Sequence, residues 1–145
     1  MPAQAPVFAG SVTPGNTLIW TASGQVGHPG DVADPDGAAG VIVNHLIGAN
    51  HGIPDITAPI DSLIGVFTGP AFADIFVMGS AGSISVPARA TKFFMGTMDG
   101  YGWANNVGAF RVEVGELNGV PDGGSTLGML MLGLGFIGFA AKNRK

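Results

Sequence analysis

The residues best suited to chemistry lie in the segment 96–108, which carries one carboxylate, Asp99, and two adjacent amides, Asn105 and Asn106. Carboxylate and amide oxygens are ligands of hard cations such as Ca²⁺, which takes about six to eight oxygens in all. Backbone carbonyls, waters or a second loop would have to supply the remaining ligands. Asp, Asn and Gly also form ordinary turns, and on spacing alone a turn is the favoured interpretation of this segment.

Other polar residues give weaker signals. The segment 31–37 resembles half of a calcium-binding loop, but it lacks the spacing and the terminal Glu of an EF-hand, so a solvated acidic turn is favoured. The histidines His28, His45 and His51 are too scattered to indicate a zinc site. The sequence contains no G-x-S-x-G, P-loop or HExxH motif, and we expect a protein that is not an enzyme.

The composition indicates which class of protein this is and which kinds of partner it could bind. The chain has 145 residues, of which 25 are glycine and 46% are hydrophobic, which favours a turn-rich globular domain over a disordered segment or a helical bundle. Up to residue 120 it holds nine acidic and three basic residues, so it would repel a phosphate backbone and suit a cation. We therefore expect no nucleic-acid partner. The absence of cysteine rules out disulfides and thiolate chemistry.

Short strands separated by Gly, Pro and Asp turns must position the polar segment. The last of them alternates most clearly, with Phe110, Val112 and Val114 facing in and Arg111 and Glu113 facing out. The pattern predicts an all-β, jelly-roll-like β-sandwich over residues 11–119, preceded by an N-terminal extension, 1–10, and followed by a C-terminal hydrophobic helix. The seven expected strands are 16–21, 40–44, 63–67, 75–77, 83–86, 90–95 and 109–114.

The C-terminal segment 120–145 differs from the rest of the chain. It begins with the motif VPDGGS, continues with an uncharged apolar run at 126–141, and ends with three basic residues. A helix of that length rises about 24 Å, close to the hydrocarbon core of a bilayer, and the basic end would stay on the cytoplasmic side. The run is thus expected to be a transmembrane helix. A buried core helix is the alternative, which is disfavoured because the run is apolar on all faces.

The order of motif, apolar run and basic end resembles the PEP-CTERM sorting signal in its VPDSG-like variant, with Gly123 in place of the usual serine. The resemblance implies export in a Gram-negative bacterium, processing by an exosortase-type protease, and transient anchoring in the inner membrane. The cell surface, outer membrane or extracellular biofilm matrix would be the destination. The start of the sequence lacks the basic and apolar regions of a signal peptide, although 3–5 looks like the end of a cleavage site. We therefore expect a truncated or trimmed start, and a cytoplasmic protein is the alternative.

The body of the chain resembles the LecA-type (PA-I) bacterial lectins, a calcium-dependent and galactose-preferring family. The resemblance rests on an early strand at 20–24 and on the ordered segments 62–67, 84–87, 93–99 and 105–112. It implies that Asp99, Asn105 and Asn106 supply side-chain ligands to Ca²⁺. It also implies backbone carbonyl ligands from Gly102, or from Trp103 one residue later, and from His28.

The same resemblance implies a carbohydrate partner. Two adjacent hydroxyls of a sugar would replace two waters on the ion, and Asp99, Asn105 and Asn106 would also contact the sugar. Asn50 and His51 are the nearest candidates for further polar contacts, and Trp103 would stack on the sugar face or cap the site. Because single-sugar binding is weak, such lectins gain affinity through multivalency, and a homo-oligomer is left open.

Three hypotheses follow. The first is a calcium-dependent carbohydrate-binding protein that recognises a galactoside or related sugar at the cell surface. The second is a structural matrix protein in which calcium only stabilises a loop. The third is an accessory binding domain detached from a glycoside-active enzyme.

Overall fold

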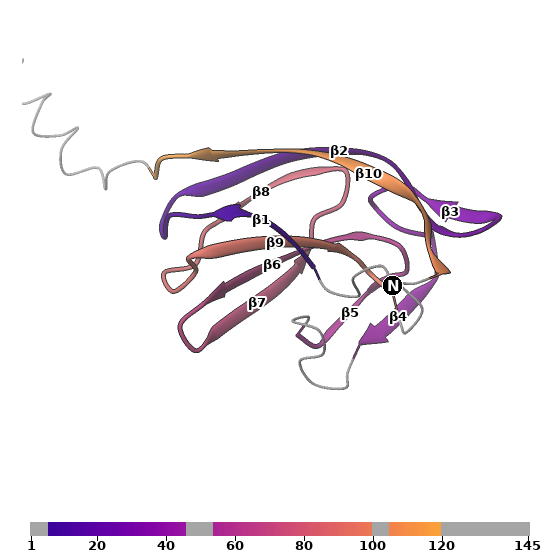
Figure 1. Ribbon diagram of the computed structural model, residues 1–145, viewed down its shortest axis with the longest axis horizontal. Coiled ribbons are helices and arrows are strands. Elements are labelled where there is room, and N and C mark those ends of the chain that lie inside the picture. Colours follow the sequence, from indigo (N-terminus) through magenta and orange to yellow (C-terminus); the bar gives the residue numbers. More distant parts are fainter. Residues whose placement is uncertain (1–5, 46–53, 100–104, 120–145) are drawn as a thin grey trace, which may run out of the picture.

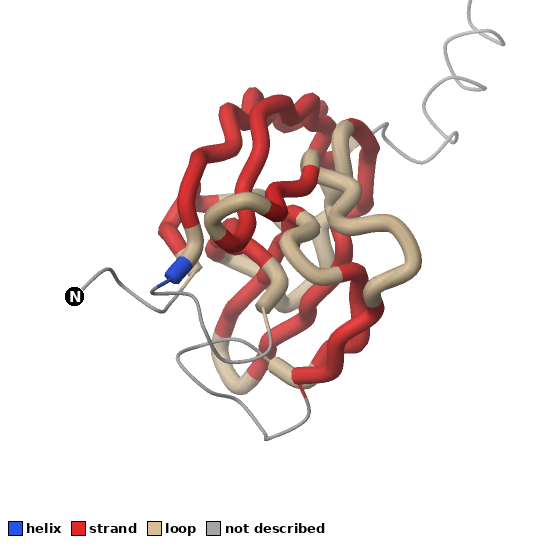
Figure 2. The backbone as a smooth tube through the Cα atoms, turned by 90° about the vertical axis from the view of Figure 1, so that its right-hand side faces the viewer, coloured by secondary structure: helices blue, strands red, loops and turns tan. Residues whose placement is uncertain are grey.

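The computed structural model describes residues 6–45, 54–99 and 105–119 (Figure 1). These ranges contain strands and connecting loops and no α-helix, and Figure 2 shows how the strands dominate the chain. No helix within them has the length and apolar character needed to cross a bilayer. The strands are β1 (Val7–Ser11), β2 (Thr17–His28), β3 (Asp31–Ala33), β4 (Ile42–His45), β5 (Ile56–Pro59), β6 (Leu63–Gly69), β7 (Phe72–Val77), β8 (Ala81–Ser85), β9 (Lys92–Thr97) and β10 (Val107–Leu117).

Two larger antiparallel sheets account for most of the strands. The first, sheet A, has the order β1-β9-β6-β7. The second, sheet B, has the order β10-β2-β3. β8 also pairs with β2, along the same edge as β3 but at the other end of the strand. A separate hairpin joins β4 to β5.

The burial pattern explains why these segments form strands. In β2, Leu18 and Trp20 are buried, while Ile19 and Thr21, the residues that follow them, are exposed. This two-residue alternation is that of a strand with one face on a core.

The first five residues of β6, 63–67, are all buried because both faces of the strand are covered. Leu63 and Phe67 pack in the main core. On the opposite face, Ile64 packs with Ala58 of β5 and with Met98.

The two sheets enclose one main core. Leu18 and Trp20 from sheet B pack with Leu63, Phe67 and Phe93 from sheet A. The indole N–H of Trp20 donates a buried hydrogen bond of 3.1 Å to the carbonyl of Met78, and the Trp20 ring lies 5.8 Å from that of Phe76. The predicted all-β sandwich is therefore confirmed.

Each of the seven expected strands overlaps a strand of the structure, most of them longer than expected. Three strands were not anticipated, β1, β3 and β5. β1 begins at Val7 and pairs with β9, so sheet A includes residues that the sequence suggested were an N-terminal extension. The expected C-terminal helix at 126–141 lies outside the described residues.

Candidate functional site

The turn between β5 and β6 brings a carboxylate, Asp61, to the end of β9. The Ser62 hydroxyl donates to the Pro59 carbonyl at 2.8 Å and closes the turn. The Asp61 N–H then donates to Met98 O at 2.8 Å, and the Met98 N–H donates to Ser62 O at 2.7 Å. Asp61 has a φ of +63°, in the left-handed region that Asp tolerates better than most residues. These bonds fix Asp61 beside Asp99, the residue that follows Met98.

The Asp61 carboxylate lies over the backbone of β2 at Gly27. A Cβ placed on Gly27 would come 2.9 Å from Asp61 Oδ2 and 2.6 Å from the Asp31 carbonyl oxygen. Gly27 also has a φ of +155°, at which a side chain is strained. Only glycine at this position leaves room for the carboxylate.

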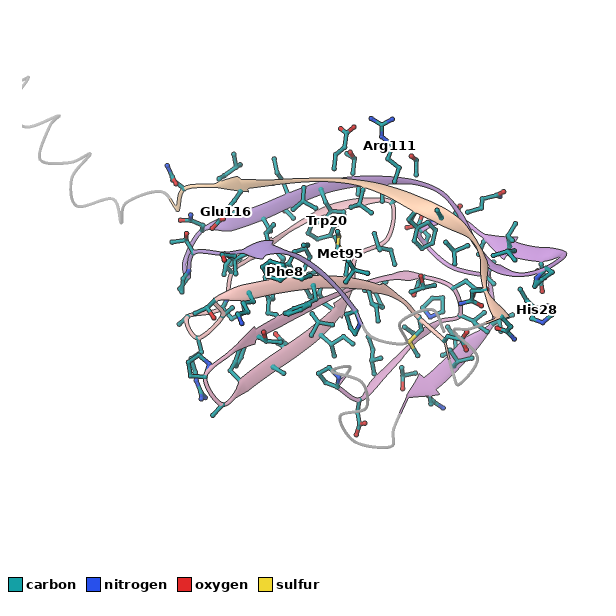
Figure 3. The ribbon with its side chains drawn as sticks, in the orientation of Figure 1. Phe8, Trp20, His28, Met95, Arg111 and Glu116 are labelled. Atoms are coloured by element: carbon teal, nitrogen blue, oxygen red, sulfur yellow. The ribbon has the colours of Figure 1, made fainter. Side chains whose placement is uncertain are left out.

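Gly27, which lies next to the Asp61 carboxylate, is in β2 and pairs with both neighbouring strands of sheet B, β10 and β3. Val107, the first residue of β10, pairs with Gly27, and His28 pairs with Asp31 of β3. The same end of the sandwich thus holds Asp61, Asp99 and Asp31 together with His28, and we call this group the acidic end. Figure 3 shows His28 at the opposite end of the sandwich from Glu116.

The electrostatics of the acidic end are dominated by Asp61, which is 6% exposed. Within the described ranges no hydrogen bond reaches its carboxylate. Burial raises the pKa of Asp61 above its usual value, and the nearby carboxylates of Asp99 and Asp31 raise it further, against a smaller opposing effect of His28. The acidic end therefore holds negative charge that the described residues compensate only in part.

The structure brings several of the expected site residues to this end. Asp99 is 8% exposed and acts electrostatically on Asp61. His28 is the last residue of β2, and half-buried Asn106 directly precedes Val107, so the pairing of β10 with β2 places Asn106 next to His28. Asn105 is adjacent and exposed.

The other expected site residues, Gly102, Trp103, Asn50 and His51, lie outside the described residues. Among residues 6–45, 54–99 and 105–119, no three His, Asp or Glu side chains come close enough together to form a metal site of their own.

The acidic segment 31–37 is divided between two roles. Its first three residues form β3, which the sequence did not predict. Asp36 accepts hydrogen bonds from both the N–H, at 2.9 Å, and the hydroxyl of Ser80. These bonds lower the pKa of Asp36, so this carboxylate ties the segment to the start of β8 and serves a structural role.

Asp61 is the site residue that sequence reasoning missed. In the sequence, Asp61 is recognisable only as a polar residue in the turn Pro59–Ser62. The strand that follows this turn begins with five residues that are apolar or glycine. The proximity of Asp61 to Asp99 depends on the pairing of β6 with β9, in which Leu63 lies opposite Thr97. The pairing register of two distant strands is therefore needed to recognise Asp61.

Comparison with known protein families gives one match. Residues 119–145 match the VPDSG-CTERM motif. No curated protein matches the chain. The C-terminal segment therefore carries a sorting motif, which is consistent with an exported protein and with processing by a sorting protease.

Proposed function

We propose that the chain is an exported, calcium-dependent carbohydrate-binding protein whose cation site lies at the acidic end. The observation that carries the proposal is the buried Asp61 carboxylate, which has no hydrogen-bond partner among the described residues and lies beside Asp99. Burying a negative charge without a partner is unfavourable, and a bound cation would compensate it.

The chemistry of the surrounding groups suits Ca²⁺. Asp99 offers a carboxylate, Asn105 and Asn106 offer amide oxygens, and His28 offers its backbone carbonyl, in keeping with the oxygen ligands that a hard cation prefers. Asp61 would add a second buried carboxylate close to the ion. The carbonyl of Gly102 would complete the protein ligands from the loop that precedes Asn105.

Carbohydrate would bind on the exposed side of this ion. Two adjacent sugar hydroxyls would take the place of waters, and exposed Asn105 and half-buried Asn106 would share hydrogen bonds with them. Asn50, His51 and Trp103 are the proposed further sugar contacts. The resemblance to LecA-type lectins supports a galactoside or a related sugar as the proposed ligand.

The sorting motif supports the proposed location of the protein. An exosortase-type protease would process the chain after transient anchoring in the inner membrane through a helix at 126–141. The mature protein would then reach the surface or the extracellular matrix of a Gram-negative cell.

A structural matrix protein is the second candidate, because sheet B ends in a long strand, β10, that pairs only with β2 among the described strands. It also has exposed apolar residues at both ends, Val107 and Leu117. In that case calcium would stabilise the loop at 100–104 without contacting a sugar. A measurement of sugar binding distinguishes the two candidates, because only the carbohydrate-binding protein should bind sugar.

The test is isothermal calorimetry on the full chain, first with calcium and then with galactosides in the presence and absence of a chelator. We expect calcium to release heat, and sugar to bind only when calcium is present. The double variant Asn105→Ala and Asn106→Ala should abolish calcium binding. The matched control is Asp74→Asn, which removes a carboxylate from the middle of β7, opposite Phe67, and should bind calcium normally.

Each outcome decides one part of the proposal. If the wild-type chain gives no heat with calcium, the cation site is refuted. If calcium binds but a panel of sugars does not, the matrix role replaces the lectin role. Normal calcium affinity in the double variant would exclude this loop as the site.

A further inference from the structure

The outer edge of sheet B is formed by β10, which is eleven residues long. Its register with β2 is uninterrupted from Val107 opposite Gly27 to Leu117 opposite Thr17. Within the part of the chain that the structure describes, β2 is its only strand partner, so one row of its backbone N–H and C=O groups faces outward.

Other sheet edges are shorter or irregular. β1, at one edge of sheet A, has five residues, and its register with β9 shifts between Phe8 and Gly10. β7, at the other edge, has six residues. Proteins commonly shorten or distort edge strands to prevent pairing with another chain. β10 is longer than either and keeps its register with β2 throughout, which makes it the edge best suited to accept a strand.

Two opposite charges lie at the centre of β10. Arg111 and Glu113 project from the outer face of sheet B, where their side chains are 82% and 71% exposed, and Arg111 Nη2 lies 3.3 Å from Glu113 Oε1. Val112 lies between them and faces the core. The order Arg-Val-Glu is therefore complementary to itself when read in the opposite direction.

We propose that β10 pairs antiparallel with β10 of a second copy of this chain, about a two-fold axis through Val112. In this register Arg111 of each copy lies opposite Glu113 of the other, and directly opposed unlike charges stabilise antiparallel strands. The pairing joins the two copies of sheet B into one continuous sheet. Such a closed, isologous interface is the commonest arrangement of homodimers.

The apolar residues of β10 agree with the same register. Val107 and Leu117, at the two ends of the strand, are 43% and 53% exposed. The two-fold axis through Val112 places Val107 of each copy opposite Leu117 of the other. The pairing thus covers an exposed apolar side chain at each end of the strand, as well as the open backbone edge. It does not depend on the proposed cation site.

Sedimentation equilibrium of the full chain in density-matched detergent tests the pairing. We expect a dimer, twice the chain mass of 14.6 kDa. Arg111→Glu places like charges opposite each other at two positions and should weaken the dimer about tenfold or more. Glu113→Arg should weaken it similarly, whereas the double swap Arg111→Glu with Glu113→Arg should restore it. Lys92→Glu, the same change of charge on β9 of sheet A, is the control and should leave the dimer intact.

A cross-linking experiment tests the register directly. The chain has no cysteine, so the variants Ala109→Cys and Gly115→Cys each carry one. Positions 109 and 115 face each other in the proposed pair, whereas two copies of position 109 lie roughly 20 Å apart at about 3.4 Å per residue. Mild oxidation should link the mixture of the two variants and leave each variant alone unlinked.

The results that overturn the pairing are equally specific. A monomer at all concentrations refutes it. A dimer that is unaffected by Arg111→Glu, or that the double swap fails to restore, shows that another surface joins the copies. Linking of either cysteine variant with itself, without linking in the mixture, refutes the register.

Discussion

Removing the charge of Asp61 should stabilise the chain when calcium is absent. The carboxylate is buried, and its pKa is raised by burial and by the neighbouring carboxylates Asp99 and Asp31. A raised pKa means that the wild-type protein loses stability as the pH rises through the folded-state pKa of this group. Asp61→Asn has a similar shape but no charge, so it should escape this loss.

The size of the effect follows from the burial of the group. A buried polar group without a partner costs about 1–3 kcal/mol, and a charged group costs more. Among the described residues the amide of Asn would also have no partner, so we expect Asp61→Asn to recover about 1–2 kcal/mol near pH 7. For a domain of this size, that corresponds to a rise in Tm of roughly 4–8 °C. The gain should shrink on acidification and vanish below the ordinary carboxyl pKa of about 3.9.

Thermal unfolding of the full chain in chelator, followed by near-UV circular dichroism from pH 3 to pH 8, measures this effect. The matched control is Asp36→Asn, because the pKa of exposed Asp36 is lowered by hydrogen bonds from Ser80. A lowered pKa gives stability that is present above the ordinary carboxyl pKa and lost as the pH falls, so this variant should be slightly less stable than the wild type at pH 7. If Asp61→Asn also lowers Tm at pH 7 in chelator, the carboxylate has a stabilising partner and the reasoning is wrong.

Three further predictions concern calcium, the core and the backbone. Saturating calcium at about 100 times its dissociation constant should raise the stability of the wild-type chain by about 2.7 kcal/mol, and by less in Asp61→Asn, as thermal unfolding with and without the ion will show. Phe67→Ala leaves a cavity in the fully buried core and should cost about 3–5 kcal/mol in urea unfolding; a loss below about 1 kcal/mol would contradict the central place of this ring. Gly27→Ala places a Cβ within 2.9 Å of Asp61 Oδ2 and 2.6 Å of the Asp31 carbonyl oxygen, so it should lower both Tm and calcium affinity. Unchanged Tm and affinity would show that β2 does not constrain the acidic end.

The sequence predicted the fold class well because alternation survives in the strands that line the core. β2 shows it clearly. In β10, Phe110 and Val112 pack against the core as expected, whereas Val114, also expected to face in, is 40% exposed. The segment 63–67 was expected as a strand and forms part of β6. β1, β3 and β5 were missed because they have only three to five residues, too few to establish a period against their Gly, Pro and Asp neighbours. These segments form strands because each pairs with a neighbouring strand: β1 with β9, β3 with β2, and β5 with β4.

The candidate site could be predicted only where its residues are close in sequence. Asp99 and the pair Asn105–Asn106 stand in one segment and were recognised together. Asp61 and Asp31 reach the same end through the pairing of β6 with β9 and of β3 with β2, and no local pattern encodes those registers. The burial that makes Asp61 unusual is likewise a property of the assembled sheets.

The pairing of β2 with β10 has a consequence for the timing of folding. Thr17 pairs with Leu117 and Gly27 with Val107, so the longest ladder among the described strands joins segments that are far apart in the sequence. Such distant contacts form slowly, because the intervening chain loses much freedom when its ends meet. During synthesis, one edge of β2 stays unpaired until β10 has been made. A chain that stops before Val107 would leave that edge open and prone to aggregation, so the domain can complete its folding only after nearly all of it has been made.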